Sequence, residues 1–338
     1  DAARGVLPQE VDSNAFAACF TPGIERFATD AGDLAEARLD VEADEAHVDA
    51  VATLVPRAGD NEARRRLAAM RAVSATGLLD APAEAIISLF SAESAAARAD
   101  DASTLGPCLG GALAPILGTG GPPKLAGALA GWAAGRGDLE RAAFVEKASV
   151  AGFVLSTPVQ DRSAASSSLR AFADLAGEPG LADAVRRMLP LRAGQVQPAD
   201  VPGVGSASVL MFQPHAPAAR SDTETSTATA GLTPPGLAWS VTDKEIDVGL
   251  GQSPKELLAL TRAAVTLRST TAAGSAGPLL EKDVAFAAYV VPPGCCTTGT
   301  PASSALTFTW GRKDGNAAAK LEVGDELLGQ LVAHEMSH

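Results

Sequence analysis

The sequence predicts an α+β protein, in which repeated β-hairpin–helix–strand units form a largely antiparallel sheet with helices packed on one face. Three observations predict this class. Apolar and polar residues alternate in closely spaced pairs of short segments, as in hairpin strands. A helical pattern follows each of the two clearest pairs, and an apolar strand-like segment follows each of these helices. This order favours an antiparallel sheet with a layer of helices on it.

The first unit lies near the N-terminus. Two strand-like segments, 37–41 and 47–54, flank a short acidic turn. A helix is predicted over 61–71, and the apolar run AIISLF at 85–90 is predicted as a strand.

The second unit begins with alternating apolar residues over 237–250, interrupted by the turn Thr-Asp-Lys-Glu. Ser253 and Glu256 have capping-box spacing, with Pro254 at the first helical position, so a helix is predicted from there. The segment 283–291 is predicted as a buried strand. The lead-in PLLE at 278–281 matches GLLD at 77–80, so we interpret the two units as a structural repeat despite their low identity.

Partial copies of this unit fill much of the remaining chain. Strand material over 144–155 precedes a helix over 163–175, and a hairpin over 306–323 precedes a last helix that starts near Gly324. Two stretches interrupt the pattern. The segment 213–236 is predicted to be a mobile polar loop. The segment 105–135 is nearly uncharged, and it divides an N-terminal α+β lobe (1–104) from a C-terminal lobe (136–338).

Composition excludes several classes of protein. With 46% hydrophobic residues, the 338-residue chain can bury a core, so global disorder is excluded. A net charge of −13 without a Lys/Arg run argues against nucleic acid as a partner. No P-loop, dinucleotide fingerprint or G-x-S-x-G elbow occurs, so no cofactor is predicted.

Small residues recur at every fourth position in Gly127, Gly131 and Gly135, a spacing that packs helices closely in membranes. A spanning helix needs about 20 consecutive apolar residues, and four prolines interrupt this run: Pro107, Pro115, Pro122 and Pro123. We therefore predict no transmembrane span and a closely packed helix. Peripheral membrane contact, or a partner-protein surface, through 105–135 stays open.

The N-terminus and the cysteines point to an oxidising compartment. The chain begins at Asp1, as a mature chain does after signal-peptide removal, so we expect a periplasmic or secreted protein. The even set of cysteines provides disulfide candidates: Cys19, Cys108, Cys295 and Cys296. We favour bridges from the adjacent pair Cys295-Cys296 to Cys19 and Cys108. A vicinal disulfide between Cys295 and Cys296 is the alternative.

The sharpest chemical signal is the closing segment HEMSH, an H-E-x-x-H motif. It resembles the signature of the zincin metalloproteases. The resemblance implies that His334 and His338 bind zinc and that Glu335 is the base that activates the metal-bound water. A catalytic zinc needs a third protein ligand, and none follows in this sequence. His47, His215 or an upstream carboxylate would have to supply it.

These observations favour a non-catalytic extracytoplasmic protein that acts as a structural, accessory or binding component of an envelope or extracellular assembly. Its partners would be other proteins of that assembly. A zinc-dependent metallohydrolase truncated after its H-E-x-x-H helix is the alternative, and only that hypothesis requires zinc. A second alternative is a carrier that holds an apolar ligand between the sheet and the Ala-rich helices.

Overall fold

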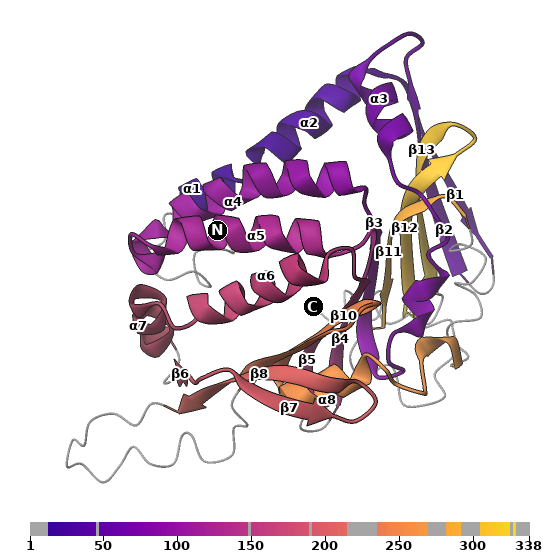
Figure 1. Ribbon diagram of the computed structural model, residues 1–338. Helices are drawn as coiled ribbons and strands as arrows, with labels where there is room; N and C mark the ends of the chain where they lie inside the picture. Colours follow the sequence, from indigo (N-terminus) through magenta and orange to yellow (C-terminus); the bar gives the residue numbers. More distant parts are fainter. Residues whose placement is uncertain are drawn as a thin grey trace, which may run out of the picture.

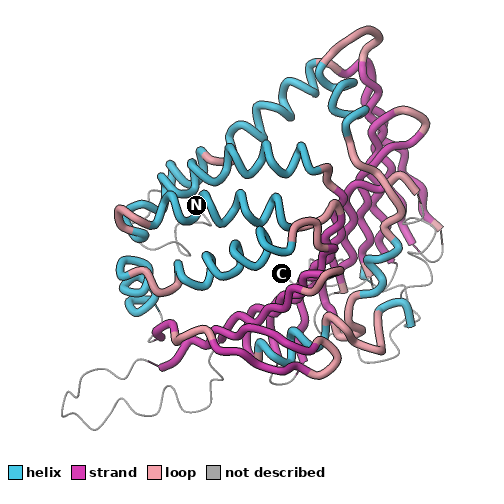
Figure 2. Tube along the Cα trace, in the orientation of Figure 1, coloured by secondary structure: helices cyan, strands magenta, loops and turns pink. Residues whose placement is uncertain are grey.

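The computed structural model describes residues 13–44, 47–147, 150–188, 191–214, 235–269, 282–291, 305–324 and 327–328. The chain is α+β, as predicted, and its strands form a 13-stranded antiparallel sheet. Figure 1 and Figure 2 show α4, α5 and α6 stacked as a layer on one side of this sheet, with α8 on the other side of β9 and β10. The strands are β1 (Leu34–Ala43), β2 (His47–Pro56), β3 (Ala85–Ala92), β4 (Leu139–Lys147), β5 (Val150–Pro158), β6 (Leu191–Ala193), β7 (Gln197–Val201), β8 (Gly205–Pro214), β9 (Pro235–Val241), β10 (Glu245–Gln252), β11 (Val284–Val290), β12 (Leu306–Lys313) and β13 (Asn316–Gly324).

The strand order is β1-β2-β13-β12-β11-β3-β4-β5-β10-β9-β8-β6, with β7 paired to β8. Strands from opposite ends of the chain meet in the middle, where β3 pairs with β11. Hairpins β1–β2 and β9–β10 lie toward opposite ends of the sheet. The first pairs with hairpin β12–β13, and the second pairs with hairpin β4–β5. Three strands from the end of the chain, β11 to β13, therefore lie between β2 and β3 of the first 104 residues.

The helices are α1 (Ser13–Ala18), α2 (Thr21–Gly32), α3 (Glu62–Ala69), α4 (Ala95–Leu117), α5 (Gly121–Gly135), α6 (Arg162–Leu175), α7 (Pro179–Met188) and α8 (Pro254–Leu260). There are also two 3₁₀ turns: η2 (Thr76–Asp80) precedes β3, and η3 (Leu267–Ser269) precedes β11. Side-chain caps fix several starts: Asn61, Ser94 and Asp161 accept hydrogen bonds from backbone N–H groups in the first turns of α3, α4 and α6. α8 differs from the expectation, because Ser253 is left-handed (φ 53°) and its side chain makes no cap.

Glycines bring the helices of the layer into close contact. A Cβ at Gly135 would lie 2.4 Å from the backbone N of Ala165 in α6, and a Cβ at Gly110 in α4 would lie 3.0 Å from the Pro122 carbonyl oxygen in α5. Pro107 and Pro115 lie inside α4, so they do not end the helix, although each removes a backbone donor. None of the described helices is long and apolar enough to cross a membrane.

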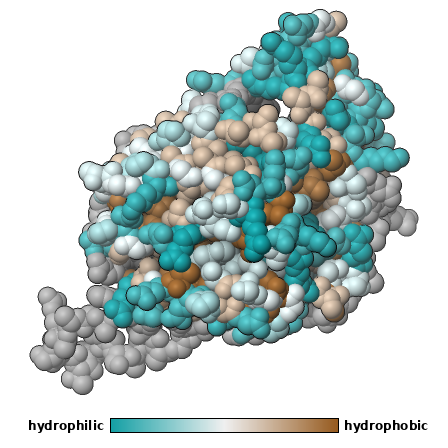
Figure 3. Space-filling model, viewed as in Figure 1, coloured by the Kyte–Doolittle hydropathy of each residue, from teal (hydrophilic) through white to brown (hydrophobic). Residues whose placement is uncertain are grey.

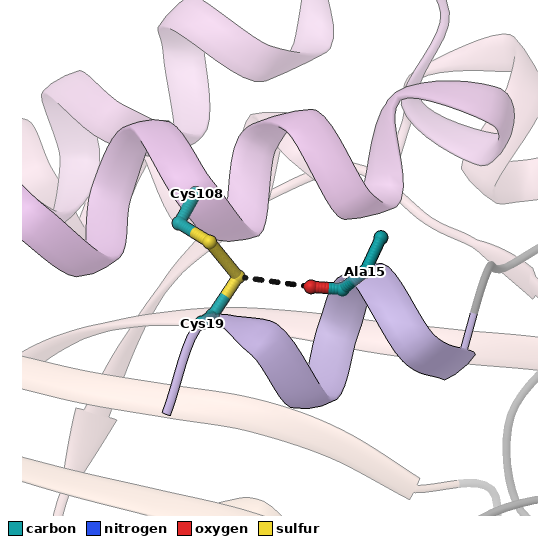
Figure 4. The surroundings of a disulfide bond; sticks show 3 residues. All are labelled: Ala15, Cys19 and Cys108. Atoms are coloured by element: carbon teal, nitrogen blue, oxygen red, sulfur yellow. Dashed lines mark hydrogen bonds between the residues drawn. A yellow bond between two sulfur atoms is a disulfide. The ribbon is translucent and has the colours of Figure 1, made fainter. Parts of the chain in front are cut away.

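A disulfide joins Cys19, just after α1, to Cys108 in α4 across 89 positions of sequence (Figure 4). This pairing corrects the expectation that Cys295-Cys296 bridges to Cys19 and Cys108, because those two cysteines are bonded to each other. The reason is spatial. Because α1 packs along α4, the Cα atoms of Cys19 and Cys108 lie 5.5 Å apart. Cys295 and Cys296 themselves lie outside the described residues. A disulfide is compatible with an oxidising compartment.

The two faces of the sheet bury different cores. We call them the α6 face and the α8 face after the helices that cover them. On the α6 face, Trp239 and Ile246 pack with Ala165 and Leu169 of α6. On the α8 face, a larger core lies under η2, η3 and α8 and includes Phe90, Val145, Tyr289 and Leu257. The boundaries of β8 and β9 lie at Pro214 and Pro235, so they extend slightly into the predicted polar loop.

The turns of hairpins β1–β2 and β9–β10 have the same hydrogen bonds. The backbone N–H of His47 donates to the Asp44 side chain, and the N–H of Asp44 donates to the His47 carbonyl. In the other hairpin, Glu245 and Thr242 take the same two roles. In consequence Asp49 and Asp247 each lie two residues beyond the turn, on the same face of their strands.

Candidate functional site

Apolar side chains form continuous rows across the α6 face. Residues directly opposite each other on paired strands share a face of the sheet, so the register identifies each row. The first apolar row consists of Val41, Ala50, Leu321, Phe308, Ala288, Leu89, Ala142, Leu155, Val248 and Trp239. The second apolar row consists of Ala43, Val48, Val323, Leu306, Val290, Ile87, Phe144, Phe153, Leu250 and Leu237.

Helices cover only part of these rows. Trp239 ends the first apolar row under α6 with 5% exposure, whereas Val41 at the opposite end is 61% exposed. In the second apolar row Phe153 is 52% and Leu250 is 47% exposed, although they are direct neighbours across β5 and β10. Leu39, two residues from Val41, is 67% exposed. Among the described residues, four of the six exposed large apolar side chains therefore lie on the α6 face.

The open part of the α6 face is apolar but incompletely buried. Phe308, Trp310 and Phe286 are half-buried, and the rings of Phe286 and Phe308 lie 6.2 Å apart. The rings of Phe144 and Phe153 lie 4.9 Å apart. Figure 3 shows hydrophobic residues at the surface in several separate patches, with hydrophilic residues between them. Exposed apolar side chains that gather on one face are a common feature of binding sites.

The α8 face carries charged groups instead, and the first cluster surrounds Asp247. This carboxylate is fully buried; one of its oxygens is 2.5 Å from the Arg262 guanidinium, and the other makes no hydrogen bond to a described residue. Arg262 also pairs with Glu245. Burial lowers the pKa of Arg262, but the two carboxylates outweigh it and raise that pKa overall. Arg141 extends the cluster by lying 3.3 Å from both Glu245 and Ser156.

The second charged cluster lies on β2 and β13. The ligating atoms of His47, Asp49 and Glu322 lie within 4.8 Å of one another. The Lys320 ammonium is 2.7 Å from Asp49 and 3.6 Å from Glu322, so it offsets part of the negative charge of these two side chains. Burial raises the pKa of Glu322, and Lys320 opposes that shift. The donor set is of the kind that binds divalent metals, but the Lys320 ammonium already lies beside its two carboxylates.

A third polar network supports the helix layer. Arg98 is 2% exposed and donates to Asp138, to Gln160 and to the backbone carbonyls of Glu93 and Ala133. It thereby links α4 to the end of α5, to Asp138 just before β4 and to Gln160 just after β5. Burial raises the pKa of the Glu93 carboxyl, which pairs with Arg136. Because the Arg98 donors are occupied by the protein itself, this network is structural.

The zinc residues predicted from the sequence are mostly not described. His334, Glu335 and His338 lie outside the described residues, as does His215, and only 327–328 of the last predicted helix is described. His47, the other substitute ligand, pairs with Gly324, the last residue of β13. The structure brings His47 together with Asp49 and Glu322, a neighbourhood that the sequence alone did not predict.

Sequence reasoning also missed the apolar rows. Alternation in each strand was visible, but a row exists only once ten strands have a common register. The one available signal was the alternation Leu39, Val41 in a strand that carries charges on its other side.

Comparisons with protein-family models, with curated proteins and with solved structures found no match.

Proposed function

We propose that this protein is a non-catalytic, periplasmic or secreted binding component of an envelope or extracellular assembly, and that the open part of the α6 face is its binding surface. The observation that carries the proposal is the exposure of Leu39, Val41, Phe153 and Leu250 on one apolar face. Its partner would be a protein that presents an apolar surface or segment. The Cys19–Cys108 disulfide supports an oxidising compartment.

Energy considerations support a bound partner on this face. Burial of apolar area is worth about 25 cal/mol per Å², so the exposed side chains represent free energy that the described fold does not use. The charged clusters offer a poorer case for chemistry. Asp247 and Asp49 are already paired with Arg262 and Lys320, respectively.

We infer in addition that the chain contains two repeated units, one starting with β1–β2 and the other with β9–β10. Exchanging the units (β1 for β9, β2 for β10, β3 for β11, β4 for β12, β5 for β13) reverses the central strand order and otherwise leaves it unchanged. The identical hydrogen bonds of the two hairpin turns support the same inference. A repeat of this kind suits an assembly protein, because it extends one sheet face without requiring a catalytic centre.

Photo-crosslinking tests the binding surface. Benzoylphenylalanine is introduced in place of Phe153 or Leu39, and the protein is irradiated in the cells that produce it. We expect discrete protein adducts from both positions. Val265 provides the matched control, because it is an apolar residue with 62% exposure that follows α8 rather than lying on the α6 face. A probe at that position should give no such adduct.

Two results would overturn the assembly role. Equal adducts from Val265 and Phe153 would show contact without preference for the α6 face. Adducts of lipid mass from Phe153 would favour the carrier of an apolar ligand instead.

The zinc hydrolase stays a separate prediction. Metal analysis of the purified chain, with Glu335→Gln as the control for activity, tests it directly. Stoichiometric zinc together with hydrolysis that is lost in the variant would replace the binding role proposed above.

A further inference from the structure

Hairpins β1–β2 and β9–β10 have matching sets of apolar residues on the α6 face. Their turns share the same hydrogen bonds, so Asp44 corresponds to Thr242 and His47 to Glu245. Counted from these positions, each apolar residue of β9–β10 that packs in the α6 core has an apolar counterpart on β1–β2. The pairs are Leu237 and Leu39, Trp239 and Val41, Val241 and Ala43, Ile246 and Val48, and Val248 and Ala50.

The two sets differ in their cover. Trp239 is 5% exposed and Ile246 is fully buried, in one core with Ala165 and Leu169 of α6. None of the counterparts on β1–β2 is buried, and Val41 is 61% exposed. The β1–β2 hairpin is thus apolar at the same positions, but no described helix covers it as α6 covers β9–β10.

α6 shows which kind of element covers such a hairpin. It begins beside the β9–β10 turn, where Arg162 lies 2.7 Å from Asp243. Its residues Ala165, Leu169 and Ala173 belong to the core on the sheet and follow one another at a spacing of four. This is the apolar stripe of an amphipathic helix. A helix in the same place on β1–β2 needs a stripe with the same spacing.

The sizes of the sheet side chains specify that stripe further. Valine on β1–β2 corresponds to Trp239 and to Ile246, and alanine corresponds to Val241 and to Val248. At the packing density of protein interiors, a sheet with smaller side chains needs larger ones from the helix that covers it. The two alanines of the α6 stripe would leave voids on β1–β2, whereas leucines at the same spacing would fill them.

The β1–β2 turn adds a preference for charge. The sequence at 42–45 is EADE, so this end of the hairpin is acidic. The corresponding end of β9–β10 carries Asp243, beside which α6 starts with a basic residue, Arg162. A basic first turn is therefore favoured in a helix that covers β1–β2.

We propose that the partner of the open α6 face contributes an amphipathic helix, which lies on β1–β2 as α6 lies on β9–β10. Its stripe consists of leucines or side chains of similar size at every fourth position, and its first turn is basic. This inference rests on the proposed function and names the element by which the partner binds.

Binding of synthetic peptides to the purified full chain tests this inference. The α6 peptide has the sequence of residues 162–175, and the leucine peptide differs from it by Ala165→Leu and Ala173→Leu. Both are stapled through the exposed positions 166 and 170, because peptides of this length are marginal helices in water. Fluorescence anisotropy measures their dissociation constants. We expect the leucine peptide to bind about tenfold more tightly than the α6 peptide, and a scrambled leucine peptide not to bind.

Substitutions in the full chain test the location of the peptide. Val41→Lys should raise the dissociation constant of the leucine peptide about tenfold or more. Val265→Lys is the matched control, because Val265 is 62% exposed but follows α8, and it should have no effect. Val41→Trp introduces the residue that β9 has at this place. It should improve binding of the α6 peptide and weaken binding of the leucine peptide, which then overfills the site. Thermal denaturation of each variant checks that the fold is intact.

Several results would overturn the inference. The leucine peptide could fail to bind, or Val265→Lys could weaken binding as much as Val41→Lys does. A protein adduct from a probe at Leu39 in cells would in that case still support the proposed function, so the two failures are distinguishable. Attached residues that alternate along the partner with a period of two would show a bound strand instead of a helix. An adduct within the chain itself, for example to 325–338, would show that no partner is needed.

Discussion

The two ends of the first apolar row show the same chemistry in opposite environments. Trp239 lies under α6 and is almost completely buried, whereas Val41 is mostly exposed. Every position between them is apolar, and the register is continuous across ten strands. The difference lies in the cover: α6 packs over β9, and no described helix packs closely over β1.

This contrast teaches that an apolar face does not by itself define a core. A core forms where a second layer supplies complementary side chains, as Ala165 and Leu169 do for Trp239. The same contrast appears among the charges of the α8 face. Asp247 and Asp49 hold matching positions beyond matching turns, but Asp247 is fully buried and the Asp49 side chain is 18% exposed.

Loss of the paired cation should destabilise the fold much more at Asp247 than at Asp49. Arg262→Met removes the cation from Asp247 and leaves a fully buried charge uncompensated, so we expect a loss of about 3–5 kcal/mol in the free energy of unfolding. Lys320→Met removes the cation from Asp49, which keeps access to water, and we expect about 1 kcal/mol. Urea denaturation of both variants at neutral pH measures the difference.

Adding Asp247→Asn to Arg262→Met serves as the control, because the double variant no longer buries a charge. It should recover part of the lost stability. Equal losses for Arg262→Met and Lys320→Met would show that burial does not distinguish the Asp247 and Asp49 sites.

A second prediction compares leucines on neighbouring strands of the α6 face. Leu210 on β8 faces Leu237 and is 2% exposed, whereas Leu250 on β10, also opposite Leu237, is 47% exposed. Leu210→Ala should destabilise the fold by about 2–5 kcal/mol, because it opens a cavity in a closed core. Leu250→Ala should cost less than about 1 kcal/mol.

Thermal denaturation by calorimetry checks this pair. A large loss for Leu250→Ala in the isolated chain would mean that the open part of the α6 face is covered in solution. That outcome would also remove the main support for a binding surface there.

The smallest effect concerns pH. Burial raises the pKa of Glu322 above its ordinary value of 4.5, so the folded state binds this proton more tightly than the unfolded chain does. The stabilisation from this group is complete below the ordinary value and disappears as the pH rises through the raised pKa. Glu322→Gln should therefore remove a decline in stability that the wild type shows over this range.

Unfolding free energies of the wild type and Glu322→Gln, measured in small pH steps upward from about 4, give the comparison. Lys320→Met should enlarge the decline, because Lys320 is the group that opposes the shift. A Glu322→Gln protein whose pH profile coincides with that of the wild type would contradict the assignment.

Local patterns predicted much of the fold. The hairpins at 37–54, 237–250 and 306–323, the strands at 85–90 and 283–291, and the helices at 61–71 and 163–175 all have counterparts in the structure. These elements follow from periodicity, which acts over a few residues. The helices α1, α2 and α7 and the strands β6 to β8 did not stand out, because their segments are short or mix apolar and polar residues without a clear period.

The candidate site needed information that periodicity does not contain. Val41 and Trp239 belong to one row only because β11 pairs with β3 and brings the two ends of the chain together. The Cys19–Cys108 pairing likewise depends on α1 lying along α4. The exposure of Phe153 could not be predicted, since an alternating strand looks the same whether or not a helix covers it.

The central pairing of β3 with β11 also constrains how the chain acquires its structure. During synthesis β3 emerges long before β11, and β2 emerges long before its neighbour β13. Until the last part of the chain arrives, both early strands have an open edge and an apolar side. Sheets built from such distant segments form slowly and expose surfaces on which nascent chains aggregate. We expect the nascent chain to depend on chaperones until β11 to β13 have been made, and a ribosome-bound chain ending before β11 should bind them strongly.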